Sequence, residues 1–507
     1  MSLIKKAKSH SLLLLIIVYS LIRIINLTLL PIFNDEAIYL DWGWRETHIP
    51  GMLYYSMYDS KPPFLMWFFG IFETIFTDPL FAGRLVSVFV GIFTLSGIYL
   101  IAKTYFNKNI ALLSSLLYIF IPIFSFFDRQ ALMESAIAAI NVWAYYFAVK
   151  VWTTNKQHYA YFLGLILGIG FCIKYSATLF IVTYVILSGI FLWKGRKKDQ
   201  TIKQTGIVLG TLFASTFLLI INPDFLNSLP RNAQYSLTLP ELLQFPIMIW
   251  LKNIKSNVII TFFYLTPFIL ISSLAGFALI FKEKKKTHLL LIVWILLCLI
   301  LQTLIARGTS QRYLVSYLPL LVIPAAYIFH VFIEKNKTRG LFILIGSLVI
   351  PFILTFLILF SPSQYILFMS KTNSYSQTEY LRDTTSGYGV KEMKDYIESI
   401  SENQQIFVGF ADNTGNPESS VVNYFHKSDH ITTGSFDSRQ FGNTLDGVDC
   451  LSLPKKMYFI SRKDEQAGMN KFLSKVKTFP NPYSNYSIGI YTIKEPCQGK
   501  SVQINIE

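Results

Sequence analysis

The sequence predicts a polytopic α-helical membrane protein with a small α/β domain at its C-terminal end. Of the 507 residues, 52% are hydrophobic and 15% are charged, and the mean hydropathy is +0.44. The apolar residues form repeated long runs rather than alternating with polar ones, which is typical of helices that cross a membrane. Beyond Ser361 the composition becomes that of a soluble domain. We therefore expect a membrane domain over residues 1–360 and an extracytoplasmic α/β domain over residues 361–507.

The net charge of +15 originates between the apolar runs. Residues 1–360 contain 30 of the 45 basic side chains but only 14 of the 30 acidic ones. Four basic clusters flank apolar runs: KKAK at Lys5, KGRKK at Lys194, KEKKK at Lys282 and KNKTR at Lys335. Basic residues collect in the cytoplasmic loops of membrane proteins, so this pattern predicts a cytoplasmic N-terminus. No basic module with stacking aromatic residues lies outside the membrane part, which argues against a nucleic-acid partner.

About eleven apolar segments are long enough, or nearly long enough, to cross a bilayer. They lie at about residues 11–33, 80–102, 110–127, 132–149, 159–173, 176–193, 205–222, 257–281, 288–306, 313–333 and 340–360. An odd number of spans places the two termini on opposite sides of the membrane. The first run is too long for the core of a signal peptide, which indicates an uncleaved first helix.

The C-terminal domain has the residue patterns of a helix and several strands. Apolar residues at helical spacing mark Lys391–Ile400 as a helix. The expected strands are Gln404–Phe410, Lys455–Ser461 and Tyr486–Ile493. We interpret His426 and His430 as surface residues, because no third metal ligand follows at a recognisable spacing.

The four cysteines form no metal-binding motif. Cys172 and Cys298 lie in apolar segments and are expected to be small buried side chains. Cys450 and Cys497 share the polar tail and could form a disulfide if this domain faces an oxidising compartment.

The most informative stretch is the outer loop over residues 34–79, which follows the first apolar run. Asp35 and Glu36 emerge at the membrane surface, and an aromatic-rich segment then leads to Lys61-Pro62-Pro63. In one interpretation, Asn34 or Asp35 caps a short helix at the membrane surface. In the other, one carboxylate is a general base that removes a proton from an acceptor hydroxyl or amine as it attacks a sugar.

A second outer loop, Asn222–Asn257, contains four prolines around the sequence LPELLQFPIMIW. An apolar and aromatic loop with this many prolines suits a segment that lies at the membrane interface and gates access for a lipid. A passive surface connector is the alternative.

Several short motifs follow one another along the membrane domain. They are DEAIY at Asp35, KPPFLMW at Lys61, GRLVS at Gly83, DRQALMES at Asp128, GFCIKYSATLF at Gly170 and QRYLVSYLPLL at Gln311. In this order they resemble the C-type membrane glycosyltransferases, such as the protein O-mannosyltransferases and the bacterial aminoarabinose transferases of lipid A. The resemblance covers residues 1 to about 360 and implies the C-type glycosyltransferase fold for this part of the chain.

The resemblance also implies an activity and a site. Such enzymes take a sugar from a polyprenyl-phosphate donor and invert its anomeric centre. By resemblance, Asp35 is the catalytic acidic residue, with Glu36 as its neighbour. The family's Lys before the paired prolines corresponds to Lys61, which is expected to contact the donor phosphate. The Tyr of the last motif corresponds to Tyr313, which is also expected to bind the phosphate.

Further charged residues are expected to complete the site. Cations stabilise the charge that develops on a phosphate leaving group. Arg231 and Arg312 are therefore expected to assist Lys61. Glu134 is a third candidate catalytic carboxylate, after Asp35 and Glu36. It stands where the family usually has Asp, and it could pair with Arg129 or Lys174 to orient the site. The other outer basic residues that could contribute are Lys252, Lys255 and Arg307.

Four residues are candidates for lining the donor cavity: Arg84, Arg129, Lys174 and Tyr39. Each has a structural alternative. The two arginines could anchor helix ends by extending to lipid headgroups, Lys174 could end a helix, and Tyr39 could belong to an aromatic belt at the interface.

We expect no cofactor. Asp35 and Glu134 could together hold a divalent ion, as in some C-type enzymes, but metal-independent transfer is favoured because Lys61 already supplies a cation.

The expected partners are a polyprenyl-phosphate-linked sugar, a lipid, protein or glycan acceptor, and membrane lipids. The expected location is a bacterial or archaeal plasma membrane. A lipid or solute transporter is the main alternative, but it predicts pseudo-symmetric halves that the sequence lacks. A non-catalytic scaffold would not account for the matching motifs.

Overall fold

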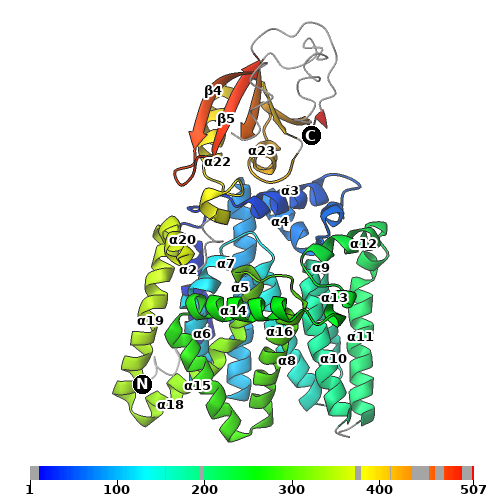
Figure 1. The fold of residues 1–507 in the computed structure, drawn as a ribbon, viewed down its shortest axis with the longest axis vertical. Helices are drawn as coiled ribbons and strands as arrows, with labels where there is room; N and C mark the ends of the chain where they lie inside the picture. The colour runs from blue at the N-terminus through cyan, green and yellow to red at the C-terminus, as the bar shows by residue number, and fades with distance from the viewer. Residues whose placement is uncertain are drawn as a thin grey trace. The chain divides into compact units, whose positions relative to one another are not determined.

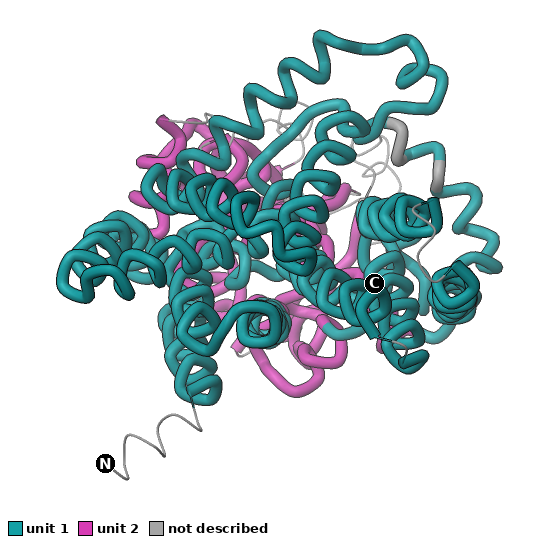
Figure 2. The backbone as a smooth tube through the Cα atoms, turned by 90° about the horizontal axis from the view of Figure 1, so that it is seen from below, with its two compact units in different colours: residues 1–27, 50–68, 84–361 teal, residues 28–49, 69–83, 362–507 magenta. Residues whose placement is uncertain are grey.

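The structure is a computed structural model in which residues 11–154, 156–193, 198–371, 378–402, 404–411, 413–436, 456–462, 473–493 and 505–506 are described. The chain divides into two compact units, which Figure 2 distinguishes by colour. Unit 1 comprises residues 1–27, 50–68 and 84–361. Unit 2 comprises residues 28–49, 69–83 and 362–507, so it joins two segments of the N-terminal region to the C-terminal tail.

Unit 1 is helical in the residues described. Its first elements are α2 (Ser11–Ile24), η1 (Tyr55–Asp59), α6 (Lys108–Phe120), α7 (Pro122–Phe127), α8 (Glu134–Thr153), α9 (His158–Ile173), η2 (Tyr175–Ala177), α10 (Thr178–Trp193) and α11 (Lys198–Ile220). Then follow α12 (Pro223–Ser228), η3 (Leu229–Gln234), α13 (Leu239–Leu243), α14 (Ile247–Tyr264), α15 (Pro267–Glu283), α16 (Lys286–Ile305), α17 (Gln311–Val315), η4 (Leu318–Leu321), α18 (Val322–Lys335) and α19 (Lys337–Phe360). Two helices, α4 (Phe64–Ile75) and α5 (Pro79–Tyr105), have residues in both units.

The apolar helices make the chain an integral membrane protein. Among the described residues, six helices are long and apolar enough to cross a membrane, or seven if α14 and α15 form one span. Four shorter apolar helices are α2, α4, α6 and α9. The number of about eleven membrane spans therefore stays a prediction.

Two of the expected straight segments are broken by proline. The segment over residues 110–127 stops at Ile121, which is extended, and α7 begins with Pro122. The segment over residues 257–281 divides into α14 and α15, which meet at an angle of 111°. Proline has no N–H for a helical hydrogen bond and excludes helical geometry from the residue before it. Consequently α14 runs across the direction of the long helices α5, α11 and α19 of unit 1 (Figure 1).

Unit 2 contains a mixed six-stranded sheet in the order β4-β5-β3-β1-β2-β6. Its elements are α3 (Asn34–His48), α20 (Pro362–Ser370), the π-helical turn η5 (Thr378–Arg382), α22 (Val390–Ser401), β1 (Ile406–Ala411), α23 (Glu418–Phe425), β2 (Ile431–Phe436), β3 (Met457–Arg462), β4 (Leu473–Pro480), β5 (Ser487–Ile493) and β6 (Asn505–Ile506). The central strand β1 pairs in parallel with β2 and β3, and all of its residues are buried. A strand buried on both faces is typical of an α/β sheet.

The small α/β domain is confirmed, including its predicted helix at residues 391–400 and its three predicted strands. Of the two histidines predicted to lie at the surface, His430 is exposed, whereas His426 is half-buried and its ring contacts Trp44. Cys298 is buried as expected, whereas Cys172 is only half-buried. Cys450 and Cys497 lie outside the described residues.

Candidate active site

The helix α3 in unit 2 carries the two adjacent carboxylates of the first outer loop. The backbone N–H of Phe33 donates a hydrogen bond of 3.0 Å to Oε2 of Glu36. Glu36 is fully buried, whereas Asp35 is half-exposed. The cap is therefore formed by Glu36 reaching back to Phe33, not by Asn34 or Asp35 as one interpretation expected, because the third helical residue can reach the N–H of the capping residue. Of the two carboxylates, Asp35 is the more accessible.

The remaining polar residues of α3 are largely buried. Asp41 and Arg45 form an ion pair of 2.7 Å, one helical turn apart. Tyr39, a candidate cavity-lining residue, is 5% exposed, and its ring centroid lies 5.8 Å from that of Trp42. These contacts make α3 a helix that is buried on most of its surface, which fixes the backbone that carries Asp35.

In unit 1, four of the predicted site residues meet in one place. Nζ of Lys174 lies 3.0 Å from Oε1 of Glu134, and Nε of Arg312 lies 3.3 Å from the same oxygen. Nζ of Lys174 also lies 5.7 Å from the centre of the Tyr313 ring, within the range of a cation–π contact. We call Glu134, Lys174, Arg312 and Tyr313 the Glu134 cluster.

Helix ends bring the Glu134 cluster together. Glu134 is the first residue of α8, where the helix dipole favours a negative charge. Lys174 has an extended backbone just after α9, and Arg312 and Tyr313 belong to the short helix α17. The Glu134 side chain is 1% exposed, against 25% for Lys174 and 13% for Arg312. A buried carboxylate thus holds two cations that retain partial access to their surroundings.

The second oxygen of the Glu134 carboxylate, Oε2, has no hydrogen-bond partner among the residues that the structure describes. Buried polar atoms are nearly always hydrogen-bonded to protein, water or ligand. With one carboxylate and two cations, the cluster carries one positive charge in excess. It is therefore suited to an anionic ligand that also offers a hydrogen-bond donor.

A second group of charges lies at the end of η1. Lys61 and Arg231 both approach Asp59, with N···O distances of 3.7 and 3.8 Å. Arg231 also donates to the carbonyl oxygen of Tyr58, and Nζ of Lys61 lies 5.0 Å from the centre of the Tyr235 ring. We call Asp59, Lys61, Arg231 and Tyr235 the Asp59 cluster. It too has two cations for one carboxylate, but its ion pairs are more exposed and individually weak.

An apolar cluster connects the regions that carry these two groups. Met57 of η1 is buried with Leu219 and Phe225, and Tyr175 of the turn after α9 packs against them. Met57 is two residues from Asp59, and Tyr175 directly follows Lys174. The structure therefore links the Asp59 cluster and the Lys174 turn through one hydrophobic contact region in unit 1.

The predicted residues Arg84 and Arg129 bind the C-terminal end of α2. Arg129 donates to the carbonyl oxygens of residues 22, 23, 25 and 26 at 2.6–3.2 Å. Arg84 donates to the carbonyl oxygen of Leu27 at 2.9 Å. Both arginines are buried, so they do not extend to headgroups. They satisfy carbonyls that a helix end leaves unpaired, and their charge complements its dipole.

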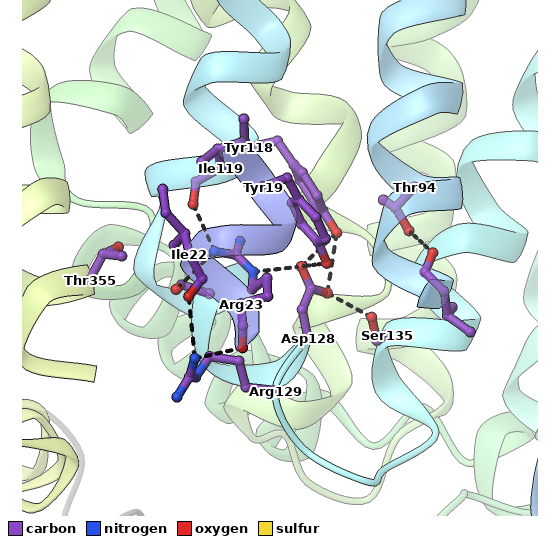
Figure 3. Close-up of polar contacts among 12 residues, drawn as sticks. Tyr19, Ile22, Arg23, Thr94, Tyr118, Ile119, Asp128, Arg129, Ser135 and Thr355 are labelled. Carbon is purple, nitrogen blue, oxygen red and sulfur yellow. Dashed lines mark hydrogen bonds and ion pairs between the residues drawn. The ribbon is translucent and has the colours of Figure 1, made fainter. Parts of the chain in front are cut away.

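A buried network around Asp128 was missed by the sequence analysis (Figure 3). The Asp128 carboxylate accepts hydrogen bonds from Tyr19 at 3.0 Å, Arg23 at 3.3 Å, Tyr118 at 3.0 Å and Ser135 at 2.6 Å. The network joins α2 to α6 and to the connection between α7 and α8. The available signal was Arg23 itself, because a charge within an apolar helix of a membrane protein requires a buried partner.

The proline-rich loop after α11 is attached to the end of α16. Nη2 of Arg307 lies 2.8 Å from Oε2 of Glu241, and the N–H of Leu237 donates to the carbonyl oxygen of Ile305 at 2.7 Å. Hydrogen bonds from the N–H and hydroxyl of Thr238, together with Arg307, lower the pKa of Glu241 to about 2. Exposed apolar side chains on this loop agree with its predicted interfacial character; they are Leu226, Leu239, Leu243 and Phe245.

The predicted residues thus divide into four groups. Asp35, Glu36 and Tyr39 belong to unit 2. In unit 1, Glu134, Lys174, Arg312 and Tyr313 meet, as do Lys61 and Arg231, while Arg84 and Arg129 bind the end of α2.

Comparison with known proteins identifies one family segment. Residues 60–221 match the family described as dolichyl-phosphate-mannose-protein mannosyltransferase. This segment includes Lys61, Glu134 and Lys174 but begins after Asp35 and ends before Arg312. No curated protein has significant sequence similarity to the chain.

Two kinds of solved structure have a similar fold. The apo crystal structure of ArnT from Cupriavidus metallidurans matches with a TM-score of 0.59 and 12% identity, covering 96% of this chain and 98% of ArnT. ArnT bound to undecaprenyl phosphate matches with a TM-score of 0.58 and 13% identity, covering 95% and 98% of the two chains. The apo Archaeoglobus fulgidus oligosaccharyltransferase matches with a TM-score of 0.51 and 12% identity, covering 98% of this chain and 76% of its own.

These identities are too low to carry residue roles, so the solved structures bear on the fold alone. The fold class predicted from the sequence is confirmed, as is the resemblance on which it was based. The chain has the fold of the C-type membrane glycosyltransferases and resembles both the dolichyl-phosphate-mannose-protein mannosyltransferases and ArnT.

Proposed function

We propose that this protein transfers a sugar from a polyprenyl-phosphate donor to an acceptor on the extracytoplasmic side of the membrane. The family match over residues 60–221 supports a glycosyltransferase, and the fold agrees with it. One of the matched crystal structures is that of ArnT with undecaprenyl phosphate, which supports a lipid phosphate as the carrier. The proposal includes a cytoplasmic N-terminus, an extracytoplasmic C-terminal domain and a plasma membrane location.

The observation that carries the proposal is the Glu134 cluster. Its members come from three separate parts of the chain, and the sequence motifs single out each of them. One carboxylate oxygen binds both Lys174 and Arg312. An arrangement with more cations than carboxylates favours a phosphate, and the Asp59 cluster has the same excess of one charge.

In the proposed reaction, the bond between the anomeric carbon and the phosphate oxygen breaks, and the electron pair leaves with the phosphate. Lys61, Arg231 and Arg312 neutralise the charge that develops on that oxygen. Fixed cations at a developing charge lower the barrier, because they are already oriented when the bond breaks. Lys174 and Tyr313 hold this arrangement through the cation–π contact and the bond to Glu134.

Asp35 is the general base of the proposed reaction. The acceptor oxygen or nitrogen attacks the anomeric carbon from the face opposite the phosphate, which inverts that centre, and its proton passes to the Asp35 carboxylate. Glu36 is a less suitable base because it is buried and accepts the Phe33 N–H. A positioned general base contributes roughly 10²- to 10⁴-fold to a rate.

We propose that the transfer needs no metal ion. Lys174 and Arg312 already lie beside Oε1 of Glu134, and these two cations would repel a divalent ion, so this carboxylate is poorly suited to share such an ion with Asp35. Turnover that persists in a chelator would agree with this proposal, and restoration of lost turnover by one divalent ion would contradict it.

The proposal is tested with the purified full-length protein and a panel of undecaprenyl- and dolichyl-phosphate sugars, each offered with lipid, peptide and glycan acceptors. Mass spectrometry identifies which donor is consumed and which acceptor gains mass. We expect consumption of one donor class, with loss of turnover in Asp35→Asn and unchanged binding of undecaprenyl phosphate. Wild-type turnover by Asp35→Asn would remove Asp35 from its role. Movement of intact donor across vesicles without consumption would instead favour the transporter alternative.

A further inference from the structure

The helix α23 of the C-terminal domain lies along α3, and both belong to unit 2. The side-chain amide of Asn423 donates to the carbonyl oxygen of Ala37 at 2.7 Å. The side-chain amide of Asn416 donates to the carbonyl oxygen of Ile32 at 3.0 Å, and its backbone N–H donates to Oδ1 of Asn34 at 2.9 Å. Asn416 and Asn423 are 1% and 2% exposed. Their hydrogen bonds therefore reach the backbone on both sides of Asp35.

Two glycines in the loops next to the sheet lie in close contact with the residues around the start of α3. A Cβ on Gly415 would lie 2.0 Å from Oδ1 of Asn34, and Gly415 has a φ of +109°. A Cβ on Gly387 would lie 1.9 Å from the carbonyl oxygen of Ile32. The N–H of Asn34 donates to the carbonyl oxygen of Thr385 at 3.0 Å. Only glycine allows backbone to approach this closely, so the tail is built to receive the first turn of α3.

The other end of α3 is held by the residues that follow α23. The Trp44 ring lies between the rings of His48 and His426, with centroid distances of 3.5 and 3.8 Å. Nζ of Lys427 lies 5.3 Å from the centre of the Trp44 ring and donates to the carbonyl oxygen of Phe76 at 3.2 Å. Both the first turn of α3 and the part near its C-terminal end are thus in contact with the segment from Gly415 to Lys427.

We propose that the C-terminal domain fixes the position of Asp35, and that Asn416 and Asn423 are the positioning residues. This inference rests on the proposed function, in which Asp35 is the base. The two buried amides determine where the first turn of α3 lies, because each bond joins a side chain of fixed length to a backbone atom. Neither residue takes part in proton transfer. The tail then serves catalysis by orienting the carboxylate rather than by adding a separate binding function.

The chemistry explains why such positioning matters. A general base acts only within hydrogen-bond reach of the proton that it removes. A displacement of about 1 Å can reduce a rate by roughly 10²-fold, even when the altered residue is remote from the reacting atoms. Loss of the Asn423 bond is therefore expected to lower kcat, while the donor, which other residues bind, keeps its KM.

The test is Asn423→Asp in the full-length protein, with Gln404→Glu as the matched control. Asn423→Asp retains the shape of the side chain but replaces its donor with an oxygen that faces the Ala37 carbonyl. Gln404 is half-buried, and its amide donates at 2.8 Å to the carbonyl oxygen of Ile400 near the end of α22, a bond that includes no residue of α3. Both variants replace a hydrogen-bonded amide of the same domain with a carboxylate. We expect kcat to fall roughly 10- to 100-fold in Asn423→Asp and less than about three-fold in Gln404→Glu, with donor KM unchanged in both.

Hydrogen exchange measured by mass spectrometry provides a readout besides activity. Peptides from α3 should exchange faster in Asn423→Asp but not in Gln404→Glu, whereas a general loss of stability would accelerate exchange in peptides from both domains in both variants. Asn423→Ser, which keeps a donor, should recover part of kcat, and it replaces the aspartate variant if the latter does not fold.

The outcomes separate this inference from the function on which it rests. If Asp35→Asn lacks turnover while the Asn423 variants keep wild-type kcat, the base assignment stands and the positioning role is refuted. Equal losses of kcat in Asn423→Asp and Gln404→Glu would also refute positioning. Normal turnover by Asp35→Asn would instead overturn the proposed mechanism itself.

Discussion

Removing the guanidinium of Arg312 should weaken binding of the donor phosphate. In Arg312→Met, Glu134 keeps Lys174 as a partner at 3.0 Å, but the Glu134 cluster changes from one positive charge in excess to neutral. A hydrogen bond to a charged group contributes about 1.5–3 kcal/mol. Since 1.36 kcal/mol corresponds to a factor of ten, we expect the Kd for undecaprenyl phosphate to rise roughly 10- to 150-fold. Isothermal titration calorimetry on the full-length protein in nanodiscs measures this change.

Arg462→Met is a closely matched control. Arg462 pairs with Glu418 at 2.9 Å, and the side chains are 13% and 1% exposed, the same fractions as those of Arg312 and Glu134. The control therefore removes an equally buried guanidinium from a buried carboxylate, but in the C-terminal sheet. It should lower the thermal midpoint and leave the Kd within about two-fold. A Kd that is unaltered in Arg312→Met, or raised equally in both variants, would refute a phosphate-binding role for the cluster.

Three further changes have expected outcomes. Glu36→Ala removes the cap on α3 and should lower the free energy of unfolding by about 1 kcal/mol. It should lower kcat far less than Asp35→Asn does, and equal losses of kcat in the two variants would place Glu36 in catalysis. Asp128→Asn leaves the buried charge of Arg23 without its counter-ion and should cost roughly 3–5 kcal/mol, seen as a large fall in the thermal midpoint, whereas an unchanged midpoint would contradict the network. Burial lowers the pKa of His426 to about 4, whereas a His in the unfolded chain has a pKa near 6.5. Between these two pH values the unfolded chain binds a proton that the folded chain does not, so the stability falls as the pH drops from about 6.5 to 4. In His426→Phe this part of the pH dependence of the thermal midpoint should disappear.

The Glu134 cluster illustrates how far motifs predict a site. A carboxylate at the start of an apolar helix needs a cation, and the sequence offered Lys174 and Arg129 as alternatives. The structure selects Lys174 and adds Arg312, while Arg129 binds the carbonyls at the end of α2. Which cation meets a carboxylate depends on how the helices pack, and that information is not contained in the spacing of residues along the chain.

Other features of the structure could not be predicted from the sequence, for related reasons. Residue patterns predicted β1, β3 and β5, which are rich in apolar residues, but not β4, which has a largely exposed surface. The bond between Asn34 and Asn416 joins residues 382 positions apart, and no local pattern encodes so distant a pairing. Asp128 belongs to the DRQALMES motif, but its partner Arg23 lies on another helix, 105 residues away, so the motif alone does not reveal the pair.

Residues 28–49 and 69–83 belong to the same compact unit as the tail, and this determines which residues a water-soluble fragment of this protein must contain. A fragment that starts at Pro362 would lose the partners of Asn416, Asn423 and His426, and it would expose to solvent the surface that α3 normally covers. Recombinant production of the tail for crystallography or NMR therefore requires α3 to be fused to it by a linker. Antibodies raised against the shorter fragment would recognise a face that is hidden in the intact protein.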